Sequence, residues 1–332
     1  MIRSFARFED GTVKPDISLD EVVLFRSRPD VVTWTDIDFG PGDEAMIEEV
    51  LGARFQFHSM AVENALRHSL HPRLDDWNDY VALVLHAVDF DPTATSLRLN
   101  ELDVFVGRNY LVTLHERKIA ALDQTWDLVL HHPRRLVRGV DNLLFQLIDA
   151  VVSAYMPIMD HFDDWQATVE DEVFQRATPG TLAQIFRQKR VLIELRRVLS
   201  GQREVLNRLA RDELGVIDVD DRGYFRDIYE HLVRLHDITE SLRDLTGGIL
   251  ETYLSVGSQR TNEIMKTMTV FTVLFLPINF VASFFGMNFF GGPYEVEPPV
   301  SGELILLFGS LTMVAIPVFM LVWMRRRGWI GR

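Results

Sequence analysis

Residues 267–285 read TMTVFTVLFLPINFVASFF, and the tripeptide Gly286-Met287-Asn288 follows directly. A second charge-free run extends from Leu304 to Met324, after a short acidic loop. Each run is as long as the roughly 18–20 apolar residues that cross a hydrocarbon core about 30 Å thick. The two runs therefore predict a transmembrane hairpin with spans at about residues 267–286 and 304–324.

The charges that flank the hairpin predict its orientation. Arg325-Arg326-Arg327 follows the second run at once, whereas the only charged residues in the loop between the runs are acidic, namely Glu295, Glu297 and Glu303. Basic residues next to a span stay on the cytoplasmic side of the membrane. We therefore expect a multi-pass protein of the cell (inner) membrane, in contact with lipid, with both termini in the cytoplasm.

The rest of the chain is strongly acidic. Residues 267–332 hold three of the 48 acidic and four of the 34 basic residues. Residues 1–266 therefore contain 45 acidic and 30 basic residues, a net charge of −15. Such a surface repels nucleic acid and attracts cations. The absence of cysteine excludes thiolate chemistry and disulfides, and we find no motif for a catalytic metal, a phosphate-binding loop or a nucleophile elbow. The sequence predicts no enzyme, no nucleic-acid partner and no cofactor.

Three domains are expected from the patterns along the chain. Residues 1–140 predict an α+β cytoplasmic domain, a small sheet flanked by helices, with strands at 22–25, 31–37, 80–89, 97–106 and 110–115. Residues 141–263 predict a stalk of long helices, of which the first is 140–173 with a kink at Pro157. The last helix would run from about Asp220 to Phe285, about 95 Å if continuous. Residues 264–332 form the two-helix transmembrane domain.

A polar stripe lies on the first span. Thr272, Asn279 and Ser283 are seven and four residues apart, so they share one helix face, and Asn262 reaches that face ten residues before Thr272. Two interpretations are open: a helix–helix interface held by small polar side chains, or the wall of a pore in a symmetric oligomer. The stripe offers neutral oxygens and no thiolate, imidazole or carboxylate, which favours a hydrated hard cation such as Mg²⁺, with Co²⁺ or Ni²⁺ as hydrated mimics.

Several segments together resemble one known family. Phe285-Gly286-Met287-Asn288 at the outer end of the first span is similar to the Gly-Met-Asn signature of CorA-type divalent-cation (magnesium/cobalt) transporters. The segments 261–266, 276–277, 55–58, 78–81 and 224–229 are also similar to that family, so the likeness covers nearly the whole chain.

The resemblance implies a funnel-shaped homopentamer in which the stalk helices continue into the pore. The implied outer selectivity site is Gly286, Met287 and Asn288, and the implied polar rings are Asn262, Thr272, Asn279 and Ser283. The implied apolar gate consists of Met265, Met268 and Leu276. Cytosolic Mg²⁺, both substrate and regulatory ligand, would bridge adjacent subunits at Asp91 and Asp227, and Glu295, Glu297 and Glu303 would concentrate cations at the outer mouth.

One segment departs from the family pattern. Magnesium-type members usually continue with Met-Pro-Glu-Leu after the signature, whereas residues 289–297 read FFGGPYEVE, a double glycine similar to zinc-transporting relatives. A zinc transporter of the same superfamily is therefore an alternative, as is a membrane-anchored metal sensor or scaffold that transports nothing. The pairs His68/His71 and His231/His236 have no further obvious ligand nearby in sequence, and we expect exposed or capping histidines there.

Overall fold

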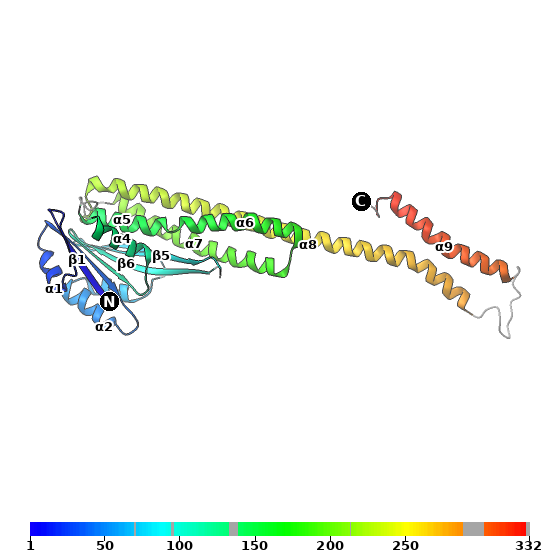
Figure 1. Cartoon of the computed structure of the whole chain (residues 1–332), viewed down its shortest axis with the longest axis horizontal. Coiled ribbons are helices and arrows are strands. Elements are labelled where there is room, and N and C mark those ends of the chain that lie inside the picture. Colours follow the sequence, from blue (N-terminus) through cyan, green and yellow to red (C-terminus); the bar gives the residue numbers. More distant parts are fainter. Residues whose placement is uncertain (70, 94–95, 133–138, 213, 288–301, 330–332) are drawn as a thin grey trace. The chain divides into compact units, whose positions relative to one another are not determined.

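A computed structural model describes all residues except 70, 94–95, 133–138, 213, 288–301 and 330–332 (Figure 1). The chain divides into two compact units, Met1–Glu251 and Thr252–Arg332. The three domains expected from the sequence, with boundaries at 140/141 and 263/264, rest on sequence patterns and not on compactness, and they stay a prediction.

The first unit contains a mixed sheet in the order β2-β1-β3-β7-β6-β5-β4. Its strands are β1 Ile2–Phe8, β2 Val13–Pro15, β3 Val31–Asp38, β4 Arg73–Asp76, β5 Val81–Asp91, β6 Ser96–Val106 and β7 Tyr110–His115. β3 and β7 pair in parallel, and the other neighbours are antiparallel. The strands expected at 31–37, 80–89, 97–106 and 110–115 are confirmed, and Gly107 lies in the turn between β6 and β7, where a Cβ would meet the Tyr110 ring at 2.1 Å.

The helices of the chain lie before, between and after these strands. Their bounds are α1 Leu19–Phe25, α2 Glu44–Ile47, η1 Glu48–Arg54, α3 Ser59–Leu66, α4 Ala120–His131, α5 Val140–Ser153, α6 Met156–Arg176, α7 Pro179–Arg211, η3 Val219–Asp221, α8 Arg222–Gly286 and α9 Gly302–Arg326. Both faces of the sheet are covered, because β3 is buried on both sides from Val31 to Ile37. Trp34 packs in a core on the α4–α5 side, and Ile37 in a second core on the α1–α3 side.

The segment 22–25 was expected as a strand, and this prediction is wrong: it lies in α1. Ser18 caps that helix, accepting a hydrogen bond from the backbone N–H of Glu21, while the Glu21 carboxylate accepts from the backbone N–H of Ser18. This reciprocal capping box fixes a helix start. It outweighs the β-branched pair Val22-Val23.

The helix expected over 140–173 is two helices, α5 and α6, which are separated at Ala154-Tyr155. Pro157 lies in the first turn of α6, where the missing N–H costs nothing because first-turn donors have no partner within the helix. The proline therefore begins a helix here and does not kink one.

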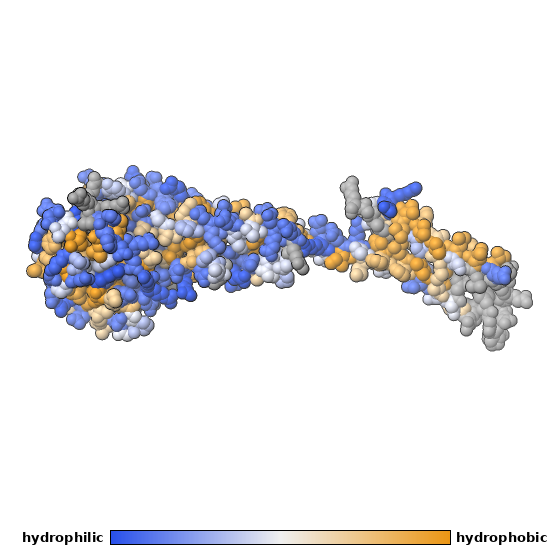
Figure 2. Space-filling view, in the orientation of Figure 1, coloured by the Kyte–Doolittle hydropathy of each residue, from blue (hydrophilic) through white to orange (hydrophobic). Residues whose placement is uncertain are grey.

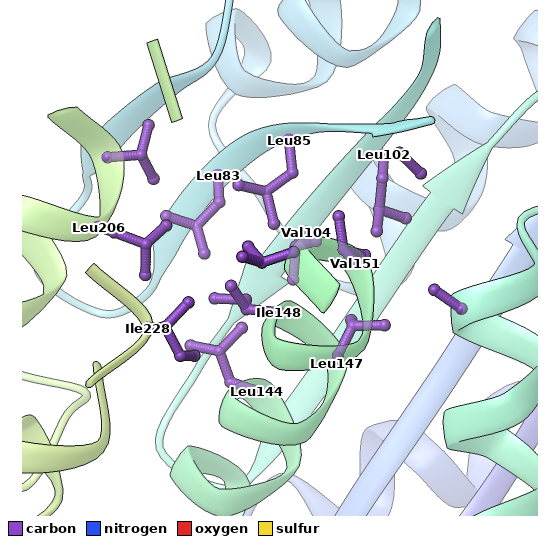
Figure 3. Close-up of a cluster of buried hydrophobic side chains, with 14 of the residues drawn as sticks. Leu83, Leu85, Leu102, Val104, Leu144, Leu147, Ile148, Val151, Leu206 and Ile228 are labelled. Atoms are coloured by element: carbon purple, nitrogen blue, oxygen red, sulfur yellow. The ribbon is translucent and has the colours of Figure 1, made fainter. Parts of the chain in front are cut away.

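The larger core joins the sheet to the long helices. Figure 3 shows Leu83 and Leu85 of β5 facing Leu144 and Ile148 of α5, with Ile228 of α8 beside them. Further along, the Gln166 side chain of α6 donates to the Leu242 carbonyl and to the Thr246 hydroxyl of α8. Within the first unit, α8 is thus held by both apolar packing and buried hydrogen bonds.

The second unit is formed by the end of α8 and by α9. By length and composition, three described segments could cross a membrane: 140–175, the apolar end of α8, and α9. Half of the apolar window in the first is buried in the protein core, but none of the window in α8 is buried. Figure 2 shows apolar side chains over the surface of these two C-terminal helices. Both C-terminal apolar helices are thus long enough to cross a membrane and expose apolar side chains.

Candidate functional site: the exposed face of helix α8

One face of α8 carries both the polar stripe and the expected gate residues. At about 100° per residue, six positions fall within an arc of roughly 80°: Met265, Met268, Thr272, Leu276, Asn279 and Ser283. Asn262 lies about 40° outside this arc. The side chains of Met265 and Leu276 are 61% and 64% exposed, and the polar members are also exposed. A single chain therefore presents this whole face without covering it.

The threonines from Thr261 to Thr272 of α8 donate their hydroxyl protons within the helix. Thr272 Oγ1 donates to the Met268 carbonyl at 2.9 Å, and Thr269 Oγ1 donates to the Met265 carbonyl at 2.7 Å. A hydroxyl that donates its proton to a backbone carbonyl keeps two lone pairs that can accept hydrogen bonds from other groups. The Thr272 oxygen is therefore a hydrogen-bond acceptor toward the space beside the helix, which suits the water molecules around a cation.

The C-terminal end of α8 is described as far as Met287. Gly286 is the last helical residue, and the Met287 N–H donates to the Ser283 carbonyl at 3.1 Å. Asn288, Glu295 and Glu297 lie outside the described residues. Glu303 is exposed in the first turn of α9.

The start of the apolar part of α8 and the C-terminal end of α9 lie close together in the second unit. Lys266 and Thr269 of α8 line one hollow with Gly328 and Trp329, which follow α9. Gly328 has a φ of 74°, and the Trp329 N–H donates to the Met324 carbonyl, so the chain folds back over the end of α9. Basic and aromatic side chains thus gather where the first span begins and the second ends, as at a membrane–water interface.

The expected regulatory residues lie in the first unit. Asp227 is exposed on α8, and Asp91 is exposed at the end of β5, where its carboxylate accepts hydrogen bonds from the backbone N–H and the hydroxyl of Thr93. Neither belongs to the carboxylate cluster that the described residues do form, Asp141, Asp218 and Asp221. The sequence predicts only a helix start near Asp220 and not this cluster, because Asp141 is distant from Asp218 and Asp221 along the chain.

A polar hollow beside the sheet was also missed in the sequence. It holds about 260 Å³ between α3 and the strands β5–β7, and His68, His86, Glu101 and Asp103 are among its lining residues. Burial lowers the pKa of His86 and raises the pKa of Asp103 well above its usual range, with the Glu101 charge adding to the latter shift. His68 is exposed, as expected, and lies 3.7 Å from Glu101 and 3.6 Å from Glu116, two carboxylates that are distant in sequence.

Comparison with known proteins agrees with this architecture. Residues 31–326 match the family described as CorA-like Mg²⁺ transporter protein. The cobalt/magnesium transport protein CorA of Thermotoga maritima is 30% identical over 314 residues, covering 94% of this chain and 87% of that protein. The zinc transport protein ZntB of Yersinia enterocolitica is 24% identical over 269 residues, covering 79% of this chain and 78% of that protein.

A solved structure shows the same fold along nearly the whole chain. The complete structure of the CorA magnesium transporter from Methanocaldococcus jannaschii superposes with a TM-score of 0.79 at 22% identity, and the match covers 98% of each chain. The arrangement of N-terminal mixed sheet, long helices and two C-terminal apolar helices is therefore shared with a full-length transporter. The expected fold class is confirmed.

Proposed function

The chain belongs to the CorA family of divalent-cation transporters, and we propose that it is a channel for hydrated divalent cations, chiefly Mg²⁺ and also Co²⁺ and Ni²⁺. The exposed face of α8 carries this proposal. It is apolar enough to cross a membrane, none of that window is buried within the chain, and it bears Thr272, Asn279 and Ser283 in line. Unsatisfied polar groups in hydrocarbon cost several kcal/mol each, so this face requires water or other protein.

We propose a homopentamer in which five copies of this face surround water. One chain with two spans cannot enclose a pore, whereas a closed ring of identical chains can. Asn288 with Gly286 and Met287 would form the outer selectivity site. The polar rings would be those of Asn262, Thr272, Asn279 and Ser283, and the apolar constriction, which closes by dewetting, would be Met265, Met268 and Leu276.

The chemistry of the stripe supports Mg²⁺ as substrate. Its groups are amide and hydroxyl oxygens, and the Thr272 oxygen is an acceptor. Mg²⁺ loses its water reluctantly, so a pore that accepts hydrogen bonds from the water shell suits it without direct ligation. A dehydrated transition metal would prefer nitrogen or sulfur ligands, which this face does not have.

For gating, we propose that cytosolic Mg²⁺ binds between subunits at Asp91 and Asp227 and holds the pore shut. Both side chains are exposed, and thus accessible to a neighbouring subunit. Residues 1–266 carry a net charge of −15, so subunits that approach one another repel unless cations lie between them. The proposed topology has both termini in the cytoplasm and Glu295, Glu297 and Glu303 outside.

Zinc is the second candidate substrate. It is favoured by the similarity to ZntB and by the double glycine in residues 289–297. The absence of imidazole and thiolate on the α8 face weighs against direct zinc ligation. Flux measurements with both ions distinguish the two.

The deciding experiment measures Mg²⁺ flux into proteoliposomes that contain the full chain. We expect flux well above that of empty vesicles, and a large loss in Asn288→Ala. Native mass measurement in detergent should give five chains. Flux no greater than in empty vesicles with each of Mg²⁺, Co²⁺, Ni²⁺ and Zn²⁺ would leave only the anchored sensor or scaffold, and a monomer would exclude the pore.

A further inference from the structure

Three carboxylates meet inside one subunit, where α5 begins and the chain turns into α8. Asp141 is in the first turn of α5, Asp218 precedes η3, and Asp221 ends η3 immediately before α8. An oxygen of each lies within 4.8 Å of an oxygen of the other two. Asp141 and Asp221 are 5% and 6% exposed, whereas Asp218 is open to solvent.

The Asp141 side chain is incompletely satisfied. Its Oδ2 accepts a hydrogen bond from the backbone N–H of Asp218 at 3.0 Å, but its Oδ1 is buried without a hydrogen-bond partner among the described residues. The charges of described residues that act on Asp141 are the carboxylates of Asp218 and Asp221. Burial raises the pKa of Asp141 to about 6 and these charges add to the shift, although the hydrogen bond from Asp218 opposes it. A buried carboxylate oxygen normally has a cation or a donor beside it, and Asp141 Oδ1 has no hydrogen-bond partner among the described residues.

From this geometry we propose that Asp141, Asp218 and Asp221 form a Mg²⁺ site within each subunit, separate from the bridge proposed between subunits. The ligands are carboxylate oxygens, which hard divalent cations prefer. Mg²⁺ holds its ligands at 2.0–2.1 Å, so two ligands on opposite sides are about 4.2 Å apart. Oxygens up to 4.8 Å apart therefore suit an ion that binds two carboxylates directly and the exposed Asp218 through water.

The site ties the start of α8 to α5. Beside it, the rings of Phe145 and Tyr224 lie 5.2 Å apart, and Ile228 packs near Leu144 in the core (Figure 3). A bound ion links α5 to the start of α8 through carboxylates, next to these apolar contacts. Occupancy of the site by Mg²⁺ therefore holds the turn over residues 214–221 and the first turn of α8 in place.

The test uses the full chain in detergent and Mn²⁺ as a paramagnetic substitute for Mg²⁺. Asp141→Asn keeps the shape of the side chain and can still accept the Asp218 N–H, and Asp218→Asn changes only an exposed group. Asp149→Asn is the matched control: Asp149 is also on α5, is half-buried, and has its pKa raised by burial, although nearby His231 opposes the shift.

We expect electron paramagnetic resonance titration to show about one fewer bound Mn²⁺ per chain in Asp141→Asn and in Asp218→Asn, and no change in Asp149→Asn. Added Mg²⁺ should slow hydrogen exchange over residues 214–224 in the wild type but not in the first two variants. Equal Mn²⁺ binding in all four proteins overturns the site. Neither readout involves transport, so failure of this site and failure of the pore are distinguishable.

Discussion

The Tyr155 hydroxyl donates a hydrogen bond to the His86 carbonyl at 2.8 Å and so connects the α5–α6 junction to strand β5. The same oxygen accepts a bond from Gln202 Nε2 of α7, also at 2.8 Å. Tyr155 and Gln202 are fully buried. One phenol therefore joins the sheet to two of the helices that cover it.

Tyr155→Phe should lower the free energy of unfolding by about 1–3 kcal/mol, because two buried groups lose their partner. Tyr155→Phe with Gln202→Leu should cost less than the sum of the single changes, since the double variant leaves no Gln202 donor unpaired. Denaturant titration of the full chain in detergent measures both. Additive effects would show that the two side chains are not coupled.

A pair of threonines on α8 tests the pore face. Thr272 and Thr267 are both exposed, and each hydroxyl donates to the carbonyl four residues earlier at 2.9 Å. They differ in direction, because five residues at about 100° each place Thr267 roughly 140° away. Thr272→Ala should change Mg²⁺ flux several-fold, about 1 kcal/mol in the barrier, whereas Thr267→Ala should leave it unchanged. Equal effects of the two variants would contradict a pore lined by the Thr272 face.

Reversing one charge on α8 tests the proposed gate. Asp227→Lys should keep the channel conducting at millimolar cytosolic Mg²⁺, because the lysine repels the ion that bridges subunits. Asp237→Lys, a change at a 73% exposed side chain on the same helix, controls for the charge alone. The measurement is flux against internal Mg²⁺, and inhibition as in the wild type would exclude Asp227 from the regulatory site.

Asp103 should make the free energy of unfolding of the first unit depend on pH, in a direction set by the shift of its pKa. Burial and the Glu101 charge raise its pKa well above that of the unfolded chain, while Arg73 opposes the shift. Above about pH 4 Asp103 is ionised in the unfolded chain but still protonated in the folded chain. The Asp103 contribution to stability therefore falls as the pH rises from that value through the folded-state pKa.

Asp103→Asn removes that ionisation and should raise the free energy of unfolding at pH 8 by about 1–3 kcal/mol, with the gain vanishing near pH 4. Unfolding at both pH values measures it, with Asp89→Asn, an exposed change on β5, as the control. A pH-independent difference would show that Asp103 does not carry the effect.

Ion competition tests the substrate. If the pore holds hydrated ions, Co²⁺ and Ni²⁺ should compete with Mg²⁺ for flux at similar concentrations, because all three carry octahedral water shells. Zn²⁺, which favours four direct ligands, should compete less well. Zn²⁺ flux that exceeds Mg²⁺ flux would favour the zinc transporter instead.

Much of the fold could be predicted from local patterns. The strands at 80–89 and 97–106 and the long α8 follow from alternation and helical spacing, which act over a few residues. The strand expected at 22–25 failed because the Ser18–Glu21 cap is stronger than the propensity of two valines. β1, which pairs with β3, was missed because its short apolar run resembles many others.

The sequence alone determined the two membrane-length apolar runs, because the hydrocarbon core has a fixed thickness and a charge-free run of that length is typical of a transmembrane helix. It also determined the polar face of α8, since helical spacing decides which side chains share a face. Only the tertiary structure decided that Asp141 meets Asp218, 77 residues away. Packing of α5 and α8 on the sheet creates that contact. Composition cannot reveal it, because each of these aspartates is, in sequence, an ordinary polar residue near a helix start.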